Sequence, residues 1–496
     1  MILIKSAQVI DGSGQPMRKA DVLIKDNKIS AIGNLATKKA ETIIDGLGYY
    51  LTPGFIDVNT DSDHYLSLFT NPPQKDFLIQ GVTTIIGGHC GSSLAPLIYG
   101  SLESIQKWSD INQINVNWHS MAEFLKTLDR AKLGVNFGTL IGHSTIRRAL
   151  VGEEIRELTE SELKVFKHLV QESLEEGALG LSTGLSYVHA KQTSFSEVKS
   201  LVELVAKNGG VYATHLRDDR EHLVESIQET IKITEETKVK TLISHLRPLI
   251  GFEDNFRKGL DLIERADREL DINFDNYPFD TSVIPIYTLL PQWAQDGGLL
   301  VMLENIKSVK LRPKLIKELA DIKDDLTIAQ SKNMPYLKGK KLSEFAKAHG
   351  LDMPEALLKL MEVTNLGAIV LYHNINIDLA SEALYSRSAL VASNGAGLPD
   401  DASTFKYERF YNTFPKFLEI IEKTGKISLE EAIKKISYIP ALKFSLKNRG
   451  LIKEGYMADL TMFSKNQITN VLVNGQLAIK NGQFQNILAG KVLKRQ

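Results

Sequence analysis

The two ends of the chain carry short runs of apolar and β-branched residues separated by turn-forming residues, and this pattern predicts β-strands joined in hairpins. The expected strands are Ile2–Ile10, Asp21–Lys25 and Lys28–Ile32 near the start, and Leu460–Phe463, Val471–Val473 and Gln476–Ile479 near the end. The dipeptide Asn474-Gly475 favours a tight turn between the last two strands. Neither end has enough apolar surface to form a core alone, so we expect residues 1–53 and 441–496 to pair into one small β-domain.

The middle of the chain, residues 54–440, alternates strand-like apolar runs with helical stretches, which is typical of a parallel sheet with crossover helices. The strand-like runs are Gly54–Val58, Thr83–Gly88, Thr139–His143, Leu179–Thr183, Val211–His215, Thr241–His245, Ile272–Tyr277, Ile369–His373 and Leu390–Asn394. Eight strands close a (β/α)8 barrel, so one of these nine runs is extra, and we expect it to be Ile369–His373. The stretch at about 285–349, rich in Lys and Leu, is too long for a simple crossover and predicts a helical insertion. The predicted fold class is therefore α/β: a TIM-type barrel with a small helical insertion and a small β-domain formed by both termini.

Composition and charge are those of a globular protein without an affinity for nucleic acid or anionic membranes. Among the 496 residues, 59 Lys and Arg face 60 Asp and Glu, and the resulting net charge of −1 lacks the basic excess of such binders. No apolar run approaches the ~18 residues of a membrane-spanning helix. The first residues lack the pattern of a secretory signal peptide. The single cysteine, Cys90, cannot form an intrachain disulfide. We expect a cytoplasmic protein whose partner is a small molecule, with oligomerisation left open.

Polar side chains that can bind metal follow several of the predicted barrel strands. They are Asn59, Asp61 and Asp63 after the first strand, Cys90 after the second, and His143, His215, His245 and Asn394 at later strand ends. All strand carboxyl ends of such a barrel lie on one face, so this architecture brings Cys90, His215 and His245 together. One thiolate and two imidazoles suit Zn²⁺, with a fourth position open for water.

Each of these residues also has an ordinary structural explanation. A free cysteine is most often a small buried apolar side chain, and a lone histidine at a strand end is more often a core or rim residue than a ligand. Three such residues on one predicted face favour a metal site. For His143 two roles remain open: hydrogen bonding behind the site, and contact with substrate.

A series of segments in a fixed order carries a family resemblance over nearly the whole chain. The segments are Pro53–Val58, Gln80–Thr84, His89–Gly91, Leu94–Pro96, Gly142-His143, Gly177–Leu185, Tyr212–Arg217, Ser244-His245, Tyr277–Phe279, Leu289–Ala294, Tyr411–Pro415, Gly450–Gly455 and Ala458–Leu460. Together they resemble the D-aminoacylase, or N-acyl-D-amino-acid deacylase, branch of the amidohydrolase superfamily. The resemblance implies the same barrel, terminal β-domain and inserted domain, with one zinc ion bound tightly by Cys90, His215 and His245.

The chain departs from the family pattern at three places. Asn59 and Asp61 replace the His-x-His that ends the family's first strand and forms a second, weaker metal position. Ser393-Asn394-Gly395 replaces Ser-Asp-Gly, whose aspartate is the family's general base, and Tyr407-Glu408 replaces a His-Pro. Asn394 has no carboxylate to accept a proton, and it could instead orient water or bind zinc through its amide oxygen.

Three residues could replace the missing base. Asp61 or Asp63 could act from the first strand, and His143 could act from the third because histidine ordinarily titrates near neutrality. Asp61 could instead be a zinc ligand, like Asn59, or both aspartates could be solvated loop caps.

Candidate substrate-binding residues come from the family resemblance and from their places after strand-end histidines. Tyr187 and Tyr277 match family positions near the substrate pocket. Arg217 and Arg247 follow strand-end histidines and could hold a carboxylate in two parallel hydrogen bonds, although rim salt bridges explain them equally well.

These features predict a zinc-dependent amidohydrolase that cleaves a non-peptide C–N amide bond, with an N-acyl-D-amino acid or a related N-acyl compound as substrate. Two alternatives stay open. One is a relative that keeps the barrel and the metal but only binds a ligand, since Asn394 stands in place of the base. The other is a cyclic-amide hydrolase.

Overall fold

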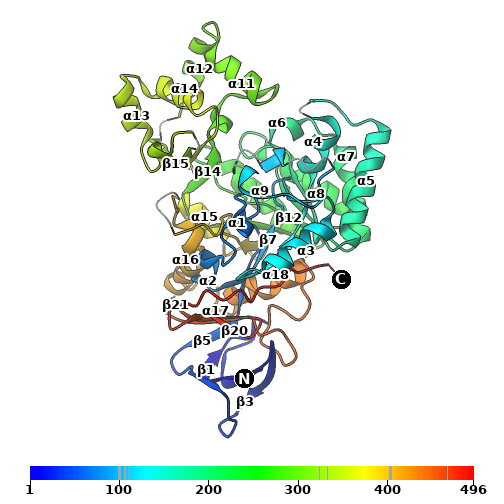
Figure 1. Ribbon diagram of the computed structural model, residues 1–496, viewed down its shortest axis with the longest axis vertical. Helices are drawn as coiled ribbons and strands as arrows, with labels where there is room; N and C mark the ends of the chain where they lie inside the picture. Colours follow the sequence, from blue (N-terminus) through cyan, green and yellow to red (C-terminus); the bar gives the residue numbers. More distant parts are fainter. Residues whose placement is uncertain are drawn as a thin grey trace.

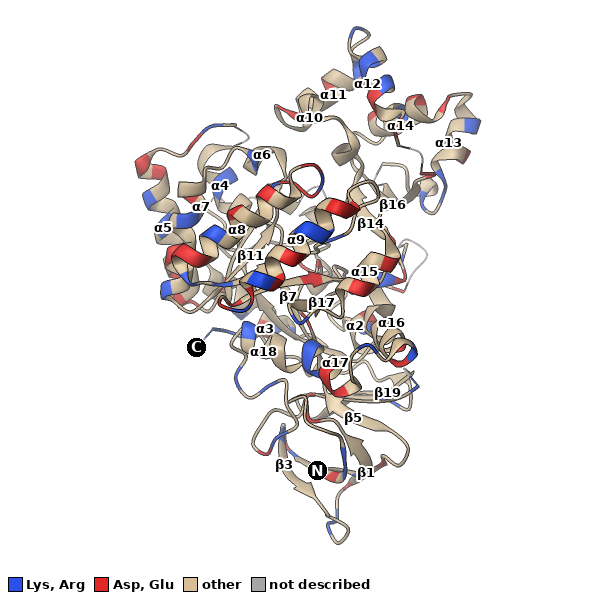
Figure 2. Ribbon diagram, turned by 180° about the vertical axis from the view of Figure 1, so that it is seen from behind, with Lys and Arg blue, Asp and Glu red and all other residues tan. Residues whose placement is uncertain are grey.

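The computed structural model describes residues 1–98, 102–105, 108–109, 111–152, 154–322, 324–331, 333–400, 405–465 and 467–495. Three parts follow one another along the long axis of the molecule: a β-sheet from the two chain ends, a barrel, and an insertion at the far end (Figure 1). Acidic and basic residues interleave along the helices that cover the barrel (Figure 2). Within the described residues, no helix combines the length and apolar character needed to cross a membrane.

Strands from both ends of the chain form one nine-stranded sheet, as the sequence predicts. They are β1 (Ile2–Val9), β2 (Arg18–Lys25), β3 (Lys28–Gly33), β4 (Thr42–Asp45), β5 (Tyr50–Pro53), β18 (Leu460–Ser464), β19 (Gln467–Val473), β20 (Gln476–Lys480) and β21 (Gln483–Phe484). The two ends meet where β5 pairs antiparallel with β18. Asn474 and Gly475 have φ of 46° and 78°, so the turn between β19 and β20 has the predicted tight-turn geometry.

Parallel strands at eight positions form the barrel in the described part of the chain, in two ladders ordered β6-β7-β8 and β9-β10-β11-β12-β13-β17. They are β6 (Phe55–Asp57), β7 (Val82–Gly87), β8 (Asn136–Thr139), β9 (Ile141–Gly142), β10 (Gly180–Gly184), β11 (Val211–His215), β12 (Lys240–Ile243), β13 (Ile272–Asn276) and β17 (Ala389–Val391). The short strands β8 and β9 share the third position. The barrel closes between its last and first positions through two backbone bonds, from Asn394 N–H to the Asn59 carbonyl (3.0 Å) and from Asp61 N–H to the Gly395 carbonyl (2.7 Å).

Helices surround this barrel. The larger ones are α3 (Met121–Ala131), α4 (His143–Val151), α5 (Glu160–Glu175), α7 (Phe195–Lys207), α8 (Leu223–Thr237), α9 (Glu253–Ala266), α15 (Ile377–Ala383), α16 (Arg409–Thr424), α17 (Leu429–Ile436) and α18 (Tyr438–Lys443). Helix α5 begins after Thr159, which forms a capping box with Glu162. One boundary differs from the sequence prediction: β9 ends at Gly142, so His143 is the first residue of α4 and not the last of a strand.

The insertion combines helices with a three-stranded antiparallel sheet ordered β14-β16-β15. Its elements are β14 (Thr281–Pro285), α10 (Gln292–Gln295), α11 (Gly298–Lys307), α12 (Arg312–Leu319), β15 (Thr327–Ser331), α13 (Leu342–His349), α14 (Met353–Val363) and β16 (Ala368–His373). The run Ile369–His373 pairs with β14 and β15, which confirms that it is the strand outside the barrel. Because β14 and β16 pair with each other, the insertion extends beyond the expected residues 285–349 on both sides.

Asp459 joins the terminal sheet to the bottom of the barrel. Its buried carboxylate accepts hydrogen bonds from the Arg449 guanidinium, from Asn136 Nδ2 of β8 (3.1 Å) and from Asn474 N–H (2.7 Å). Burial lowers the pKa of Arg449 to about 10. The pair is therefore sensitive to loss of either partner.

Replacing Asp459 by Ala is expected to lower the free energy of unfolding by about 3–5 kcal/mol, because Arg449 is left charged and buried. Urea unfolding followed by circular dichroism measures this loss. The matched control is Asp261→Ala, since Asp261 pairs with Arg265 at 2.6 Å with both side chains more than half exposed. That loss should stay below about 1 kcal/mol. Equal losses in the two variants would contradict the account of the junction.

Candidate metal centre

Three metal-binding side chains converge at the carboxyl ends of the barrel strands. Cys90 follows β7, His215 ends β11 and His245 follows β12, and their candidate ligand atoms all lie within 4.8 Å of one another. Cys90 Sγ is 3.3 Å from His245 Nε2, and the two imidazole rings meet edge to face with their centres 4.4 Å apart. A tetrahedral zinc ion holds sulfur and nitrogen ligands about 3.3–3.6 Å apart. The donor atoms and their spacing therefore fit a divalent metal such as zinc.

The backbone is bent to present these side chains. Cys90 and His245 have φ of 53° and 36°, in the left-handed region that non-glycine residues rarely adopt and that typically costs about 1–3 kcal/mol. The Cys90 loop is held by a bond from Gly91 N–H to Ser182 Oγ (3.0 Å). A Cβ on Gly184 would lie 2.3 Å from the Cys90 carbonyl oxygen, so only glycine lets β10 approach this closely. Strain of this kind is typical of functional sites.

A buried carboxylate supports His245 from behind. Asp275, on β13, accepts the His245 N–H at 2.9 Å and the side-chain amide of Asn59 at 3.2 and 3.3 Å. Burial raises the pKa of Asp275 to about 7 in spite of these bonds. Burial also lowers the pKa of His245 far below its ordinary value, and the neighbouring His215 and Arg247 charges add to the effect. His245 is thus a neutral imidazole, the form that binds metal.

Asp61 and Asn394 face each other across the closure of the barrel. Asn394 Nδ2 donates to Asp61 Oδ2 at 2.7 Å, and His64 Nδ1 lies 2.9 Å from Asp61 Oδ1. His64 Nε2 donates to the Ser92 carbonyl at 3.1 Å. Burial alone would lower the pKa of His64, but the charges of Asp63 and Asp61 raise it to about 9. Asp61 therefore lies between an amide donor and an imidazolium.

Other residues proposed from the sequence have partners outside this group. Asp63 is buried and accepts the Gly88 N–H at 2.6 Å. His143 lies 2.9 Å from Glu197, which also pairs with Arg147, and neither contact involves a metal-binding side chain. Asp63 and His143 thus have structural partners of their own, and their catalytic roles remain sequence predictions.

The two arginines proposed to bind substrate both have partners in the structure. Arg217 pairs with Glu229 at 2.7 Å and donates to the Lys191 and Thr193 carbonyls, as in the rim-salt-bridge alternative. Arg247 likewise pairs with Asp219 at 2.8 Å, as in the same rim-salt-bridge alternative, and it donates to Ser282 Oγ (3.0 Å). Its charge also acts on His245.

The two tyrosines have different neighbours. The Tyr187 ring lies 5.2 Å from the His215 ring, and burial, followed by the Cys90 charge, raises its pKa well above 10. Tyr277 is buried beneath the Arg409 guanidinium, 4.2 Å from its ring centre. Of the four, Tyr187 and Arg247 adjoin the metal-binding histidines directly.

Sequence reasoning missed three residues of this site: His64, Asp275 and Arg409. Asp275 could have been found as an acidic residue inside a strand that is buried throughout. His64 belongs to the polar run after the first strand but was given no role. Arg409 donates to the Asn394 carbonyl at 3.1 Å, and nothing local in the sequence reveals that contact.

A parallel barrel with a cysteine and two histidines at the carboxyl ends of its strands is the architecture of a metal-dependent hydrolase. Comparisons with known proteins agree. The amidohydrolase family model matches residues 401–478. The chain is 30% identical to D-aminoacylase of Alcaligenes xylosoxydans xylosoxydans, over 100% of this chain and 97% of that protein. It is also 30% identical to N-acyl-D-aspartate deacylase of the same organism, over 94% of this chain and 86% of that protein.

A solved structure of D-aminoacylase matches this chain with a TM-score of 0.83. That structure concerns the functional role of a binuclear metal centre in D-aminoacylase, with activation by one metal and attenuation by the second. It is 29% identical and covers 100% of this chain and 99% of that one. The chain belongs to the D-aminoacylase family of amidohydrolases. Family and geometry together support a metal-dependent amide hydrolase with a divalent metal at the Cys90, His215 and His245 cluster.

Replacing Cys90 by Ser is expected to weaken zinc binding more than about 100-fold, because even groups behind metal ligands contribute about 10–100-fold. After dialysis against a weak chelator, elemental analysis should find zinc in the wild type and almost none in the variant. His143→Gln is the matched control, since its side chain can still donate to Glu197 and it should retain wild-type zinc. Full zinc content in Cys90→Ser would place the metal elsewhere.

Proposed function

We propose that this protein is a zinc-dependent deacylase of N-acyl-D-amino acids or closely related N-acyl compounds. The observation that carries the proposal is the Cys90, His215 and His245 cluster beside the Asp61–Asn394 pair at the barrel mouth. The named relatives, a D-aminoacylase and an N-acyl-D-aspartate deacylase, support this substrate class. The metal, when bound, polarises the amide carbonyl and lowers the pKa of water toward ~7.

Cys90, His215 and His245 would hold the zinc ion. Asn59 is suited to a second, weaker metal position. Its Nδ2 donates to Asp275, while its buried Oδ1 has no hydrogen-bond partner among the described residues. Asp61 follows it two residues later and is the other candidate at that position. The bond from His245 N–H to Asp275 and the bond from Gly91 N–H to Ser182 Oγ hold the backbone that carries His245 and Cys90.

Asp61 is the residue suited to accept a proton in place of the missing strand-eight aspartate. It is a carboxylate, it lies at the closure of the barrel, and its charge reaches both Tyr187 and Asp275. Asn394 then has a positioning role, because its amide fixes Asp61 Oδ2 at 2.7 Å. The proton taken up at Asp61 would pass to the departing amine nitrogen.

Arg247 and Tyr187 are suited to hold the substrate. Arg247, whose charge acts on the metal-binding His245, would bind the amino-acid carboxylate. Tyr187 remains protonated, because burial raises its pKa, so its hydroxyl can donate to a carbonyl oxygen.

Replacing Asp61 by Asn is expected to lower kcat for N-acyl-D-amino acids by about 10²–10⁴-fold, because positioned proton transfer is lost. Amine release from a panel of N-acetyl-D-amino acids, with zinc content measured in parallel, tests this. Asp63→Asn is the matched control, since its amide oxygen can still accept from Gly88, and it should stay within about tenfold of wild type. Wild-type kcat in Asp61→Asn would remove Asp61 as the base. An inactive wild type that binds zinc would refute the proposed function.

Replacing Asn394 by Asp separates the enzyme from a ligand-binding relative that has lost hydrolysis. Two carboxylates this close do not both ionise near neutral pH, because the charge of one raises the pKa of the other. If Asp61 is the base, the variant should lose activity at neutral pH and recover part of it at higher pH, where both groups ionise. A pH–rate profile measures this. Gain of activity from a silent parent would instead identify the ligand-binding relative.

A further inference from the structure

A large cavity lies between the barrel mouth and the insertion. Its volume is about 690 Å³, within the range of small-molecule sites, roughly 300–1,000 Å³. Four segments far apart in the sequence line it: the turn after the first strand with Tyr65, the segment with Ser109 and Gln113, the insertion sheet with Ala329, Ile369 and Leu371, and the described residues 398–399 and 405–410 before and at the start of α16. The insertion therefore builds one wall of this cavity.

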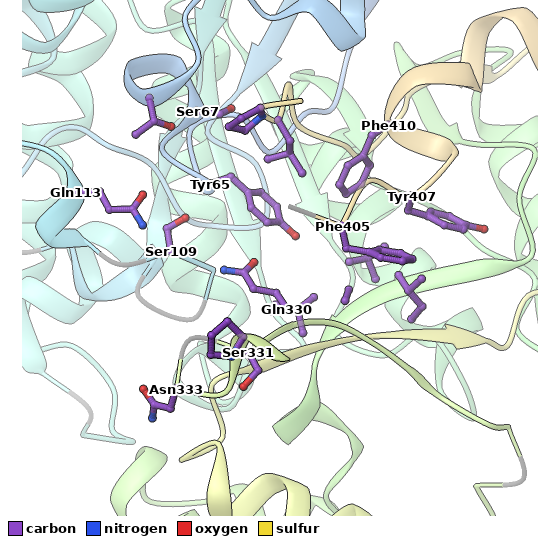
Figure 3. Close-up of a pocket in the computed structure, with 18 residues that line it drawn as sticks. Tyr65, Ser67, Ser109, Gln113, Gln330, Ser331, Asn333, Phe405, Tyr407 and Phe410 are labelled. Atoms are coloured by element: carbon purple, nitrogen blue, oxygen red, sulfur yellow. The ribbon is translucent and has the colours of Figure 1, made fainter. Parts of the chain in front are cut away.

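The cavity has an aromatic side and a polar side but no charged lining residue among those described. Figure 3 shows Phe405, Tyr407 and Phe410 on one side, the amide and hydroxyl groups of Gln113, Ser109 and Gln330 opposite, and Tyr65 between them. Burial raises the pKa of Tyr65, with Asp61 adding to the effect, so its hydroxyl stays neutral. An ionised ligand group would find no opposite charge here, which makes its desolvation unfavourable.

The cavity adjoins the proposed catalytic pair. Tyr65 N–H donates to the Asp61 carbonyl at 2.9 Å, and a Cβ on Gly395 would lie 2.7 Å from the Phe410 ring. Arg409, next to Phe410, donates to the Asn394 carbonyl. Tyr65 and Phe410, which line the cavity, therefore contact the backbone segments that carry Asp61 and Asn394.

Strand β14 separates the cavity from the proposed carboxylate site. Ser282 bonds Arg247 on one face of the strand, and Val283 lines the cavity on the other, because successive residues of a strand point to opposite faces. A trans amide directs its two substituents apart. A substrate whose carboxylate half is held at Arg247 would therefore direct its acyl half away from Arg247, and the cavity lies beyond β14 on that other side.

We propose that this cavity receives the acyl group of the substrate and selects large, uncharged acyl groups over acetyl. The inference rests on the proposed function, since it assigns the second half of the same substrate. An acetyl group has only three heavy atoms, so it fills a small part of a space that suits a whole small molecule. Octanoyl and phenylacetyl groups fill much more of it and pack against the aromatic side.

Hydrolysis of one D-amino acid carrying acetyl, octanoyl, phenylacetyl or succinyl groups by the zinc-loaded protein tests the proposal. We expect kcat/KM for octanoyl and phenylacetyl to exceed that for acetyl by about 30-fold or more, given the apolar area buried. Succinyl should be the poorest substrate, because its carboxylate meets no partner. Turnover of acetyl with no gain for the larger groups would overturn the inference and leave the proposed function standing.

Ala329→Trp fills the cavity from β15 and should reduce the octanoyl-to-acetyl ratio to below about 3-fold, since Ala329 lines the cavity and is 9% exposed. Val309→Trp is the matched control, because Val309 lies on the insertion but is 88% exposed, and it should keep the wild-type ratio.

Calorimetric binding of octanamide gives a readout that needs no turnover. Loss of binding in Ala329→Trp but not in Val309→Trp supports the cavity assignment even if hydrolysis fails. Equal binding by both variants overturns it.

Discussion

The backbone bonds that close the barrel between its eighth and first strand positions determine the geometry of the whole site. Both β6 and β17 are three residues long, so few ladder bonds hold this seam. The Asn394 N–H to Asn59 and Asp61 N–H to Gly395 bonds place the ends of these two strands side by side. The amide of Asn394 then meets the carboxylate of Asp61, although more than 300 residues separate them. Because unsatisfied polar groups are expensive to bury, this pairing stabilises the seam as well as orienting the carboxylate.

The two family departures at this seam belong together in physical terms. The resemblance drawn from the sequence implies an acid on strand eight and histidines on strand one in the family, whereas this chain has an amide on strand eight and an acid on strand one. An aspartate at position 394 would face Asp61 at hydrogen-bond distance, and the two charges would repel. Asn394 removes that repulsion and adds a donor. His64 places a positive charge beside Asp61, since the pKa of His64 rises to about 9.

Much of this arrangement could be predicted from the sequence because a parallel barrel places all strand carboxyl ends on one face. That rule alone brings Cys90, His215 and His245 together, and the hairpin pattern of the two ends predicts their shared sheet. The same rule fails for His143. The strand ends one residue earlier, at Gly142, so His143 is the first residue of a helix and not the last residue of a strand. The insertion sheet was missed since its three strands are about 40 residues apart in sequence. The roles of Asp275 and Arg409 depend on contacts between distant strands, which no local pattern encodes.

The last described residues have a consequence for how the chain is assembled. After β21 the chain returns along the bottom of the barrel, where Phe137 N–H donates to the Lys491 carbonyl and Leu493 N–H to the Phe137 carbonyl. The segment covers one end of β8, and β18 completes the sheet begun by β5. During synthesis, these residues leave the ribosome after the entire barrel. Until then, the amino-terminal strands have an unpaired edge and the barrel floor is uncovered, so a nascent chain exposes surface that chaperones recognise.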